Sequence, residues 1–411
     1  MTLNLNHVFV PGGQPTITFV DRTDHEFAKE LKKAIQRPSH IVSVSGPSKV
    51  GKTVLCKQVL DGKEYVWIDG GKVSRENSFW SLVCNELGAD IDSTHQTMVQ
   101  GSGEVSGKIP LLMTANGSML AERTLTKTST ATNMTTALKA LQDSNIILVI
   151  DDFHYIEETK RKQVVRNLKG AIFNGLKVLL LSANHRVFDA IKAEGELTGR
   201  FASVSLSAWP SSDLEQIAEL GFDALNIVRA KSLVSQLANE AQENPMLMQR
   251  FCWELCADND IYNRCSPKHC SISTESDIPK MFKSVARDAG LPIYQTLKSG
   301  PQSRTRRIKR PLKDGTSADI YEAILLAIAN TGPKSEITYD ELRDELSTLL
   351  TDKVPQKHEI TNALKQLTKI SQQENLDSAL DWDDQTNLLS VTAPFLRYYL
   401  RWQVAKKLTP L

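Results

Sequence analysis

Apolar residues follow two different patterns along this chain. Uninterrupted apolar runs at 146–150 and 178–181 predict strands that are buried on both faces, as in a parallel sheet. Apolar residues four positions apart, such as Phe27, Leu31 and Ile35, predict amphipathic helices instead. Strands are predicted at 40–45, 65–69, 146–150, 177–182 and 202–206, and helices at about 24–36, 54–60, 78–87, 134–141 and 158–173. The alternation predicts an α/β core with a parallel sheet.

The second half of the chain shows helical spacing followed by a short β pattern. A helical region is predicted over about 212–258, opened by a capping arrangement at 211–215. Further on, helices at about 320–328, 338–346 and 360–370 precede a hairpin at 379–391, which is the pattern of a winged helix. We therefore expect a core at 1–207, a helical lid at 208–285, a basic linker at 286–316 and a winged-helix domain at 317–411.

One stretch of the core, from about 88 to 132, has a different composition. It is rich in Gly, Ser and Thr, and Asn116-Gly117 lies between apolar segments at 111–115 and 118–121. Asn-Gly between two such segments is a strong signal for a two-residue hairpin turn. We expect an inserted β-hairpin here, and the alternative is an unstructured loop.

The residues from Gly46 to Thr53 read Gly-Pro-Ser-Lys-Val-Gly-Lys-Thr and fit the pattern G-x-x-x-x-G-K-[ST] at every fixed position. A strand is predicted before them and a helix after them, as a phosphate-binding loop requires. Gly46 and Gly51 permit a tight turn of inward-pointing N–H groups, while Lys52 would reach the β- and γ-phosphates of a nucleotide. The expected nucleotide-binding residues are Gly46, Pro47, Ser48, Lys49, Val50, Gly51, Lys52, Thr53 and Val54.

A pair of carboxylates ends the apolar run at 146–150. Asp151 is expected to hold Mg²⁺ together with the hydroxyl of Thr53, at the start of the loop helix. Asp152 is the residue from which a carboxylate can orient an attacking water. ATP and Mg²⁺ are therefore the expected ligands. The alternative, a buried strand that ends at two solvated aspartates, is less favoured with the loop upstream.

Charge and composition exclude some functions. Lys and Arg together number 49, Asp and Glu 48, and the formal net charge is +1, so the chain as a whole has no electrostatic drive towards nucleic acid or an anionic membrane. A local basic run, with Arg304, Arg306, Arg307, Lys309 and Arg310, lies in the expected linker and could be a solvated segment or a phosphate contact. No secretion signal or membrane span is visible, so we expect a cytoplasmic protein.

Four of the six cysteines, Cys252, Cys256, Cys265 and Cys270, lie close together in the sequence. They lack paired C-x-x-C knuckles, and Cys252 and Cys256 fall on the apolar positions of a helix. We expect these two to pack as small hydrophobic residues, with a zinc site as the less favoured alternative.

The order of these elements resembles that of the AAA+ and STAND ATPases, and among them the branch close to origin-recognition initiators and archaeal-type ATPases. The resemblance covers nearly the whole chain. Its most specific residues are Gly46, Gly51, Lys52, Thr53, Asp151 and Asp152. It implies an α/β P-loop NTPase core with a parallel sheet, AAA+/STAND-like, followed by an α-helical lid and a C-terminal winged helix.

The resemblance also implies a sensor and an arginine finger. The end of the strand at 177–182 would contact the γ-phosphate, which makes Asn184 the candidate sensor and Ser182 the alternative. Arg200 precedes the last core strand, where AAA+ oligomers carry an arginine that reaches a neighbouring subunit's ATP. The alternative is a surface arginine paired with Glu194 or Glu196.

A third implied contact lies in the lid. Asn244-Pro245 is similar to the proline motif of STAND proteins, although Glu243 stands where that motif usually has Gly. Pro245 would then contact the base of the nucleotide.

Two functions fit this organisation. The first is an ATP-hydrolysing switch or assembly ATPase, which would couple nucleotide state to homo-oligomerisation or to a protein partner carrying the effector or sensor function, in bacterial defence or a mobile-element pathway. The alternative is a DNA-loading or DNA target-selecting ATPase of the initiator or transposition-regulator type. A nucleotide-binding scaffold without turnover is disfavoured because both Asp151 and Asp152 are retained.

The winged helix bears on the choice between these functions. Lys357, Lys365 and Lys369 lie on the outward face of its expected recognition helix, together with His358 and Asn362. These side chains favour DNA, and any binding would depend steeply on salt. The expected wing carries Asp381, Asp383 and Asp384, which would repel phosphates. The alternative is a domain that docks on its own core or on a partner.

Overall fold

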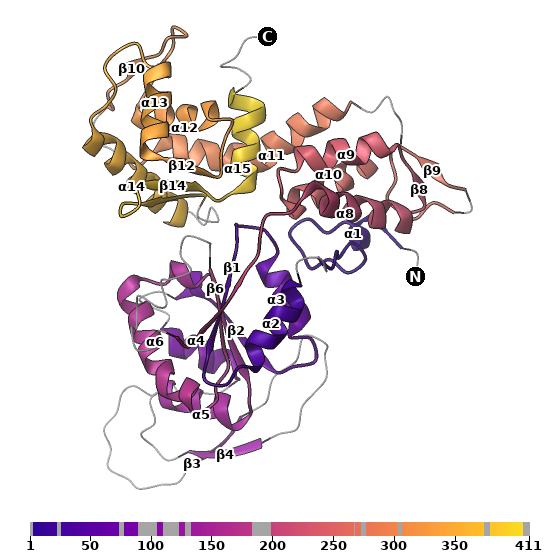
Figure 1. Ribbon diagram of the computed structural model, residues 1–411, viewed down its shortest axis with the longest axis vertical. Coiled ribbons are helices and arrows are strands. Elements are labelled where there is room, and N and C mark those ends of the chain that lie inside the picture. The colour runs from indigo at the N-terminus through magenta and orange to yellow at the C-terminus, as the bar shows by residue number, and fades with distance from the viewer. Residues whose placement is uncertain are drawn as a thin grey trace. The chain divides into compact units, whose positions relative to one another are not determined.

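The computed structural model describes residues 3–22, 26–73, 78–88, 105–109, 123–127, 133–182, 199–266, 268–272, 277–302, 306–373 and 379–405. The chain divides into two compact units (Figure 1). One, which we call the core unit, comprises Arg22–Pro47 and Gly51–Ser207. The other, the lid unit, comprises Met1–Asp21, Ser48–Val50 and Ala208–Leu411.

The core unit is built on a parallel sheet with the strand order β2-β5-β6-β1-β7. β1 (Ile41–Ser45) pairs in parallel with β6 (Val178–Ser182) and β7 (Phe201–Ser205), while β5 (Ile147–Asp151) pairs with β6 and with β2 (Tyr65–Asp69). All residues of β1 and β6 are buried, as the apolar run of β6 predicts. The carboxyl ends of these strands share one edge of the sheet, which is where α/β folds place their ligands.

Helices cover both faces of this sheet (Figure 1). α2 (Phe27–Gln36) and α3 (Lys52–Val59) lie on one side, and α4 (Phe79–Glu86), α5 (Asn133–Asp143) and α6 (Glu158–Phe173) lie on the other. The second group packs on the strand face that carries Ile68, Ile150 and Leu180. The α/β class and the parallel sheet expected from the sequence are confirmed.

A two-stranded antiparallel pair lies within the stretch expected to hold the hairpin. β3 (Val105–Ile109) pairs with β4 (Arg123–Lys127), with Val105 opposite Lys127 and Ile109 opposite Arg123. The strands expected at 111–115 and 118–121, and the Asn116-Gly117 turn, lie outside the described residues.

The lid unit begins with the short helix α1 (Leu5–Val8) and continues after β7 with α8 (Ser211–Ala224), α9 (Lys231–Glu240) and α10 (Pro245–Asp258). The short strands β8 (Ile227–Val228) and β9 (Cys270–Ser271) form a parallel pair. Phe9 packs edge-on against Phe222 of α8, with ring centroids 5.4 Å apart. The N-terminal segment is therefore part of the lid's own core.

The next helix, α11, runs from Ile278 to Ser299 without a break. The first part of the segment expected as a linker from 286 onwards is therefore helical. α11 packs on α15 (Pro394–Tyr399), and a Cβ atom at Gly290 would lie 2.3 Å from the Cβ of Tyr399. Only glycine permits this approach of the two helices.

The winged helix is confirmed. Its helices are α12 (Ile320–Asn330), α13 (Tyr339–Leu349) and α14 (Lys357–Gln373). Its antiparallel sheet has the order β12-β14-β13, formed by Glu336–Thr338, Leu388–Val391 and Leu380–Asp383. The capping box of Thr338 and Glu341 is present at the start of α13. A short ladder of β10 (Arg310–Pro311) and β11 (Ser317–Ala318) precedes it, and a π-helical segment, Leu400–Ala405, follows α15.

The cysteines divide into two groups. Cys265 and Cys270 form a disulfide, whereas Cys252 and Cys256 are buried free thiols on α10, as expected of small hydrophobic residues. Burial raises the pKa of the Cys256 thiol to about 12, and it also raises the pKa of the Cys252 thiol. Within the described part of the chain, no group of three or more His, Cys, Asp or Glu residues is arranged to hold a metal ion. None of the described helices is both long and apolar enough to span a bilayer.

Candidate nucleotide site

The phosphate loop joins the carboxyl end of β1 to the start of α3. Gly51 has a φ of 100° and occupies the position before the first helical residue, Lys52. Lys49 also has a positive φ, of 59°. Such left-handed residues turn successive N–H groups towards one side of a loop, which produces an anion-binding concavity at the start of a helix. The local backbone is therefore that of the loop expected from the sequence.

The ammonium group of Lys52 lies within this loop. Its Nζ donates hydrogen bonds to the carbonyl oxygens of Gly46 at 3.0 Å and Pro47 at 2.9 Å. Both acceptors belong to the loop itself, so the side chain folds back along the turn. A cation held at this point lies where a phosphate bound to the loop N–H groups would carry its charge.

The loop helix and the acidic strand meet directly. Thr53 Oγ1 donates a hydrogen bond of 2.9 Å to Asp151 Oδ2, and the Asp152 N–H donates to Asp151 Oδ1 at 3.0 Å. Burial raises the pKa of the Asp151 carboxyl; the hydrogen bonds from Thr53 and Asp152 and the charge of Lys52 oppose this, while Asp69 adds to it. A half-buried carboxylate beside a hydroxyl is an oxygen donor set that suits Mg²⁺, so Thr53 and Asp151 fit the expected metal ligands.

Asp152 has an unusual backbone. Its φ is 49°, in the left-handed region, and its carbonyl oxygen accepts a hydrogen bond from the Tyr155 N–H at 2.9 Å. A non-glycine residue in this conformation is costly and persists where the surroundings fix it. The strand thus turns sharply immediately after Asp151, and both carboxylates stay at the edge of the sheet that carries the loop.

Gly70 contributes to this geometry and escaped the sequence-based prediction. A Cβ atom on Gly70 would lie 2.4 Å from the Asp152 carbonyl oxygen and 3.0 Å from that of Asp151. Only glycine lets the end of β2 approach the end of β5 so closely. The double glycine after Asp69 was the available signal, since glycine directly after a strand often marks close backbone approach.

The remaining expected site residues are not all brought together. Asn184 lies outside the described residues. Ser182, the alternative sensor, ends β6 beside Ser45 of β1; both side chains are buried, and neither hydroxyl has a hydrogen-bond partner within the described chain. Because buried hydroxyls usually form hydrogen bonds, these two fit contacts with a polar ligand bound at the loop.

Arg200 lies at the opposite edge of the sheet. Its carbonyl oxygen accepts a hydrogen bond from the Ile41 N–H, at the start of β1, whereas the loop follows the end of β1. Its guanidinium is exposed and lies 4.3 Å from the centroid of the Phe173 ring. Arg200 therefore has no place in its own chain's nucleotide site, and a role in a neighbouring subunit's site stays a prediction. In the lid unit, Pro245 is the first residue of α10, and Asn244 caps that helix by accepting a hydrogen bond from the Leu247 N–H at 3.0 Å.

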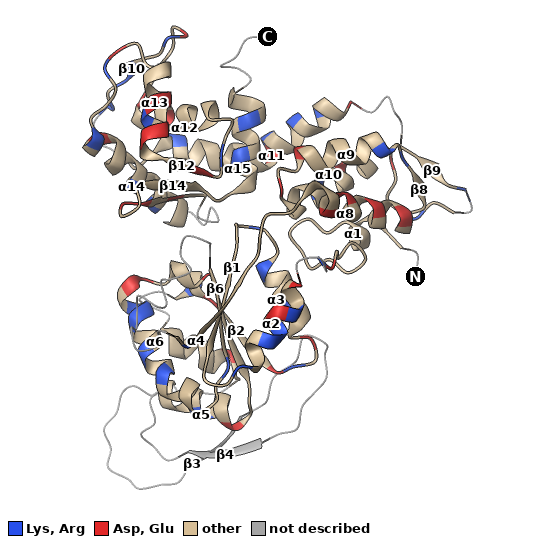
Figure 2. Cartoon of the chain, in the orientation of Figure 1, with Lys and Arg blue, Asp and Glu red and all other residues tan. Residues whose placement is uncertain are grey.

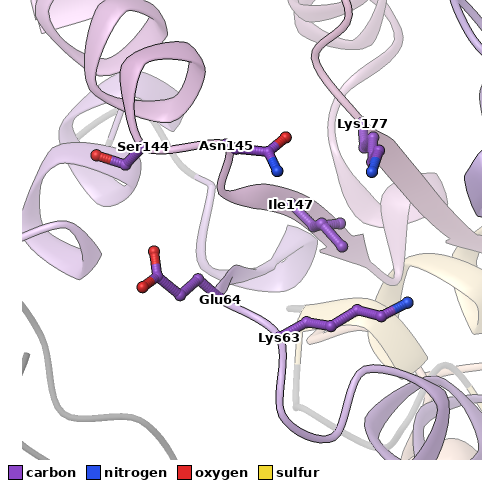
Figure 3. A pocket seen from close by; sticks show the side chains of 6 residues that line it. All are labelled: Lys63, Glu64, Ser144, Asn145, Ile147 and Lys177. Atoms are coloured by element: carbon purple, nitrogen blue, oxygen red, sulfur yellow. The ribbon is translucent and has the colours of Figure 1, made fainter.

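A pocket of about 360 Å³ lies at the same remote edge (Figure 3). Lys63 and Glu64 precede β2, Asn145 precedes β5 and Lys177 precedes β6, so the pocket faces away from the phosphate loop. Figure 3 shows Glu64 pointing away from the two lysine ammonium groups. The pocket is not part of the nucleotide site.

The surface expected to contact DNA is partly engaged within the winged helix itself. Lys365 pairs with Asp384 at 2.6 Å, and Lys357 lies 5.0 Å from the centroid of the Tyr339 ring. In the basic run, Arg307 pairs with Asp319 at 3.0 Å and Arg310 with Glu359 at 2.9 Å. Asp381 is buried in β13, so it is not an exposed charge of the wing. Figure 2 shows basic and acidic stretches interspersed along this part of the chain.

Neither a protein-family model nor a curated protein sequence matches this chain. Solved structures do. A Walker-type ATPase of Pyrococcus abyssi is 13% identical over 94% of this chain and 100% of its own, with a TM-score of 0.56. Cdc6p of Pyrobaculum aerophilum is 11% identical, with 99% of each chain covered and a TM-score of 0.46. The Orc2 protein of Aeropyrum pernix is 15% identical, with 98% of each chain covered and a TM-score of 0.48. Of these three scores only the first exceeds 0.5, and it shows that nearly the whole chain is similar in fold to a Walker-type ATPase.

Proposed function

We propose that this protein binds ATP with Mg²⁺ at the loop Gly46–Thr53 and hydrolyses it with the help of Asp152. The observation that carries this proposal is the 2.9 Å hydrogen bond between Thr53 and Asp151, because it joins the loop to the acidic strand. A glycine-rich turn without nucleotide chemistry needs no such partner. The fold similarity to a Walker-type ATPase supports the same activity.

Each residue has a distinct role in this proposal. Lys52 would exchange the carbonyl oxygens of Gly46 and Pro47 for phosphate oxygens, and the loop N–H groups would receive the remaining phosphate charge. Thr53 and Asp151 would hold Mg²⁺, which would offset the negative charge that develops on the phosphate oxygens. Asp152 would accept a hydrogen bond from the attacking water and orient it towards the γ-phosphorus.

Phosphate release and equilibrium ATP binding test these roles. Lys52→Ala should lose ATP binding because the phosphate charge is no longer compensated, whereas Asp152→Asn should bind ATP and fail to hydrolyse it. Equal loss of binding in both variants would refute this division of roles. Normal turnover by Asp152→Asn would mean that another group orients the attacking water.

We infer that the core, lid and winged helix serve a DNA-engaging ATPase. The winged helix supports this function, as do Arg306 and Lys309, two exposed cations on either side of the exposed Ile308. Lys369 is also exposed on α14. Within this proposal the core, lid and winged helix keep the limits expected from the sequence, except that residues 1–21 group with the lid and α11 joins the lid to the winged helix. Assembly into a homo-oligomer belongs to the same proposal.

Duplex DNA titrated at two salt concentrations tests this function. Replacing Arg306 and Lys309 by Ala should weaken binding and make it less dependent on salt. Lys334→Ala is the matched control, because Lys334 is a surface cation already paired with Glu341 at 2.7 Å. Binding that is insensitive both to salt and to these replacements would contradict the proposal.

The second candidate is a nucleotide-driven switch whose winged helix docks on a protein. The internal pairing of Lys365 with Asp384 and of Arg310 with Glu359 favours it, since those cations are already engaged. Absence of DNA binding at low salt by a protein that hydrolyses ATP would favour this function over the first.

A further inference from the structure

Trp209 connects the phosphate loop to the lid. It lies between β7 and α8, its side chain is 9% exposed, and its indole Nε1–H donates a hydrogen bond of 2.9 Å to the carbonyl oxygen of Val50. Val50 is 3% exposed and, with Ser48 and Lys49, belongs to the same compact unit as Trp209. This bond fixes the direction of the buried Val50 carbonyl.

The peptide that Trp209 holds is one that a phosphate would use. The Val50 carbonyl and the Gly51 N–H belong to a single planar peptide group, so their directions are fixed relative to each other. Turning the Gly51 N–H towards a bound phosphate requires the Val50 carbonyl to turn with it. The indole N–H therefore acts on the loop from the side that faces away from the nucleotide.

The backbone of Trp209 also contacts the turn between α9 and α10. Its N–H donates to the Glu243 carbonyl oxygen at 3.3 Å. Gln242 and Glu243 are consecutive left-handed residues, with φ values of 51° and 60°. Two such residues in succession, neither of them glycine, store strain of the kind found at switch regions. The turn is thus a candidate for more than one arrangement.

The same turn touches the C-terminal helix. Arg397 Nη2 of α15 donates to the Gln242 carbonyl oxygen at 3.5 Å, and Trp402 Nε1 donates to Glu240 Oε2 at 3.1 Å. Within the described chain, Arg397 Nε and Gln242 Nε2 are buried without a hydrogen-bond partner. Buried nitrogen atoms rarely stay unpaired in a single stable arrangement, so this junction has unmet contacts that a second arrangement would satisfy.

We propose that Trp209 is a positioning residue that passes the state of the phosphate loop to the α9–α10 turn, and from there through Gln242 and Arg397 to α15 of the winged helix. The proposal rests on the proposed function in one respect, that nucleotide binds at the loop. Its physical content is a chain of four groups, the Val50 carbonyl, the Trp209 indole and amide, the Gln242–Glu243 turn and the Arg397 guanidinium. The Gln242–Glu243 turn is the element with more than one arrangement, and contacts with both Trp209 and Arg397 influence which arrangement it adopts.

Trp209→Phe tests the proposal because it keeps an aromatic ring and removes the indole donor, with some loss of buried volume. Trp253→Phe is the matched control, since Trp253 Nε1 also donates one hydrogen bond, to Asn6 Oδ1 at 2.8 Å, away from the loop. Equilibrium binding gives the ATP affinity, and amide hydrogen exchange at saturating ATP and without ATP reports on residues 240–249 and 394–405. Thermal unfolding reports separately on stability.

The wild-type protein and Trp253→Phe should show an ATP-dependent change in exchange over both segments. Trp209→Phe should bind ATP about tenfold more weakly, the value for one lost hydrogen bond to a group of this kind. At saturating ATP it should show no change in either segment. A Trp209→Phe protein that keeps the wild-type exchange change overturns the proposal, as does a wild-type protein that binds ATP and shows no change.

A second variant keeps the test decisive if Trp209→Phe does not fold. Arg397→Gln removes only the last contact, so ATP should still change exchange over 240–249 but no longer over 394–405. Retention of the change over 394–405 overturns the proposal. Failure of the wild-type protein to bind ATP at all would instead refute the proposed function, and the binding measurement shows that outcome separately.

Discussion

Replacing Gly70 by Ala should slow ATP hydrolysis while leaving ATP binding nearly intact. The added Cβ would lie 2.4 Å from the Asp152 carbonyl oxygen, whereas ordinary van der Waals contact begins at 3.4 Å. The backbone at Asp152 must therefore shift by roughly 1 Å, because both partners are backbone and neither can rotate away. The phosphate loop itself is not touched.

The size of the effect follows from this displacement. A misplacement of about 1 Å in a catalytic group can lower the rate by about 100-fold. We expect kcat to fall by about 10- to 100-fold, and overpacking to reduce the free energy of unfolding by about 1–3 kcal/mol. The affinity for ATP should change by less than about threefold, because Lys52, Thr53 and Gly51 keep their places.

Steady-state phosphate release and equilibrium ATP binding separate these outcomes. Gly170→Ala is the matched control: Gly170 lies within α6, and a Cβ there meets nothing within 4 Å. That variant should retain wild-type turnover and unfold at a slightly higher temperature, because Ala favours the helix. If Gly70→Ala hydrolyses ATP within about twofold of the wild-type rate, its contact does not position Asp152.

Three further predictions use other residues. Burial raises the pKa of Asp151 above its unfolded-state value. The nucleotide-free fold is therefore more stable when Asp151 is protonated, and this stabilisation is lost as the pH rises through the folded-state pKa. Asp151→Asn should therefore raise the unfolding temperature near pH 8 and change it little near pH 4, and a lower unfolding temperature near pH 8 would contradict the sign. Glu243→Gly should be more stable in chemical denaturation than Glu243→Ala by about 1 kcal/mol, since both lose the carboxylate and only glycine suits the left-handed backbone; equal stability would argue against strain at this residue. Mixing Arg200→Ala with Lys52→Ala subunits should restore ATP hydrolysis above that of either variant alone if Arg200 acts on a neighbour's ATP, and wild-type hydrolysis by Arg200→Ala under assembling conditions would exclude that role.

The sequence was sufficient for features that depend on nearby residues. The strand of Ile147–Asp151 and the loop of Gly46–Thr53 have local signals, namely an apolar run and fixed glycine spacing, and both were predicted within about one residue. The capping box of Thr338 and Glu341 is equally local, because its donors and acceptors lie three residues apart.

Features that depend on distant parts of the chain escaped prediction. The requirement for glycine at position 70 comes from the backbone of Asp152, and the role of Trp209 comes from Val50, far from it in sequence. The disulfide of Cys265 and Cys270 depends on the path of the chain between β8 and β9. Charge pairing also altered the expected DNA face, since a lysine counted as free is paired with Asp384 once α14 and the wing are packed together.

Because α11 is continuous, a movement at its lid end is transmitted to its winged-helix end. With 22 residues it is about 33 Å long, and Met281 and Phe282 near its start are buried in the lid, whereas Tyr294 and Leu297 near its end belong to the hydrophobic core of the winged helix. A rotation of about 10° at the lid end would move the other end by about 6 Å, roughly one helical turn. Cutting the chain at the expected linker would remove Tyr294 and Leu297 from that core, so a fragment that begins at 317 would start with an exposed apolar face.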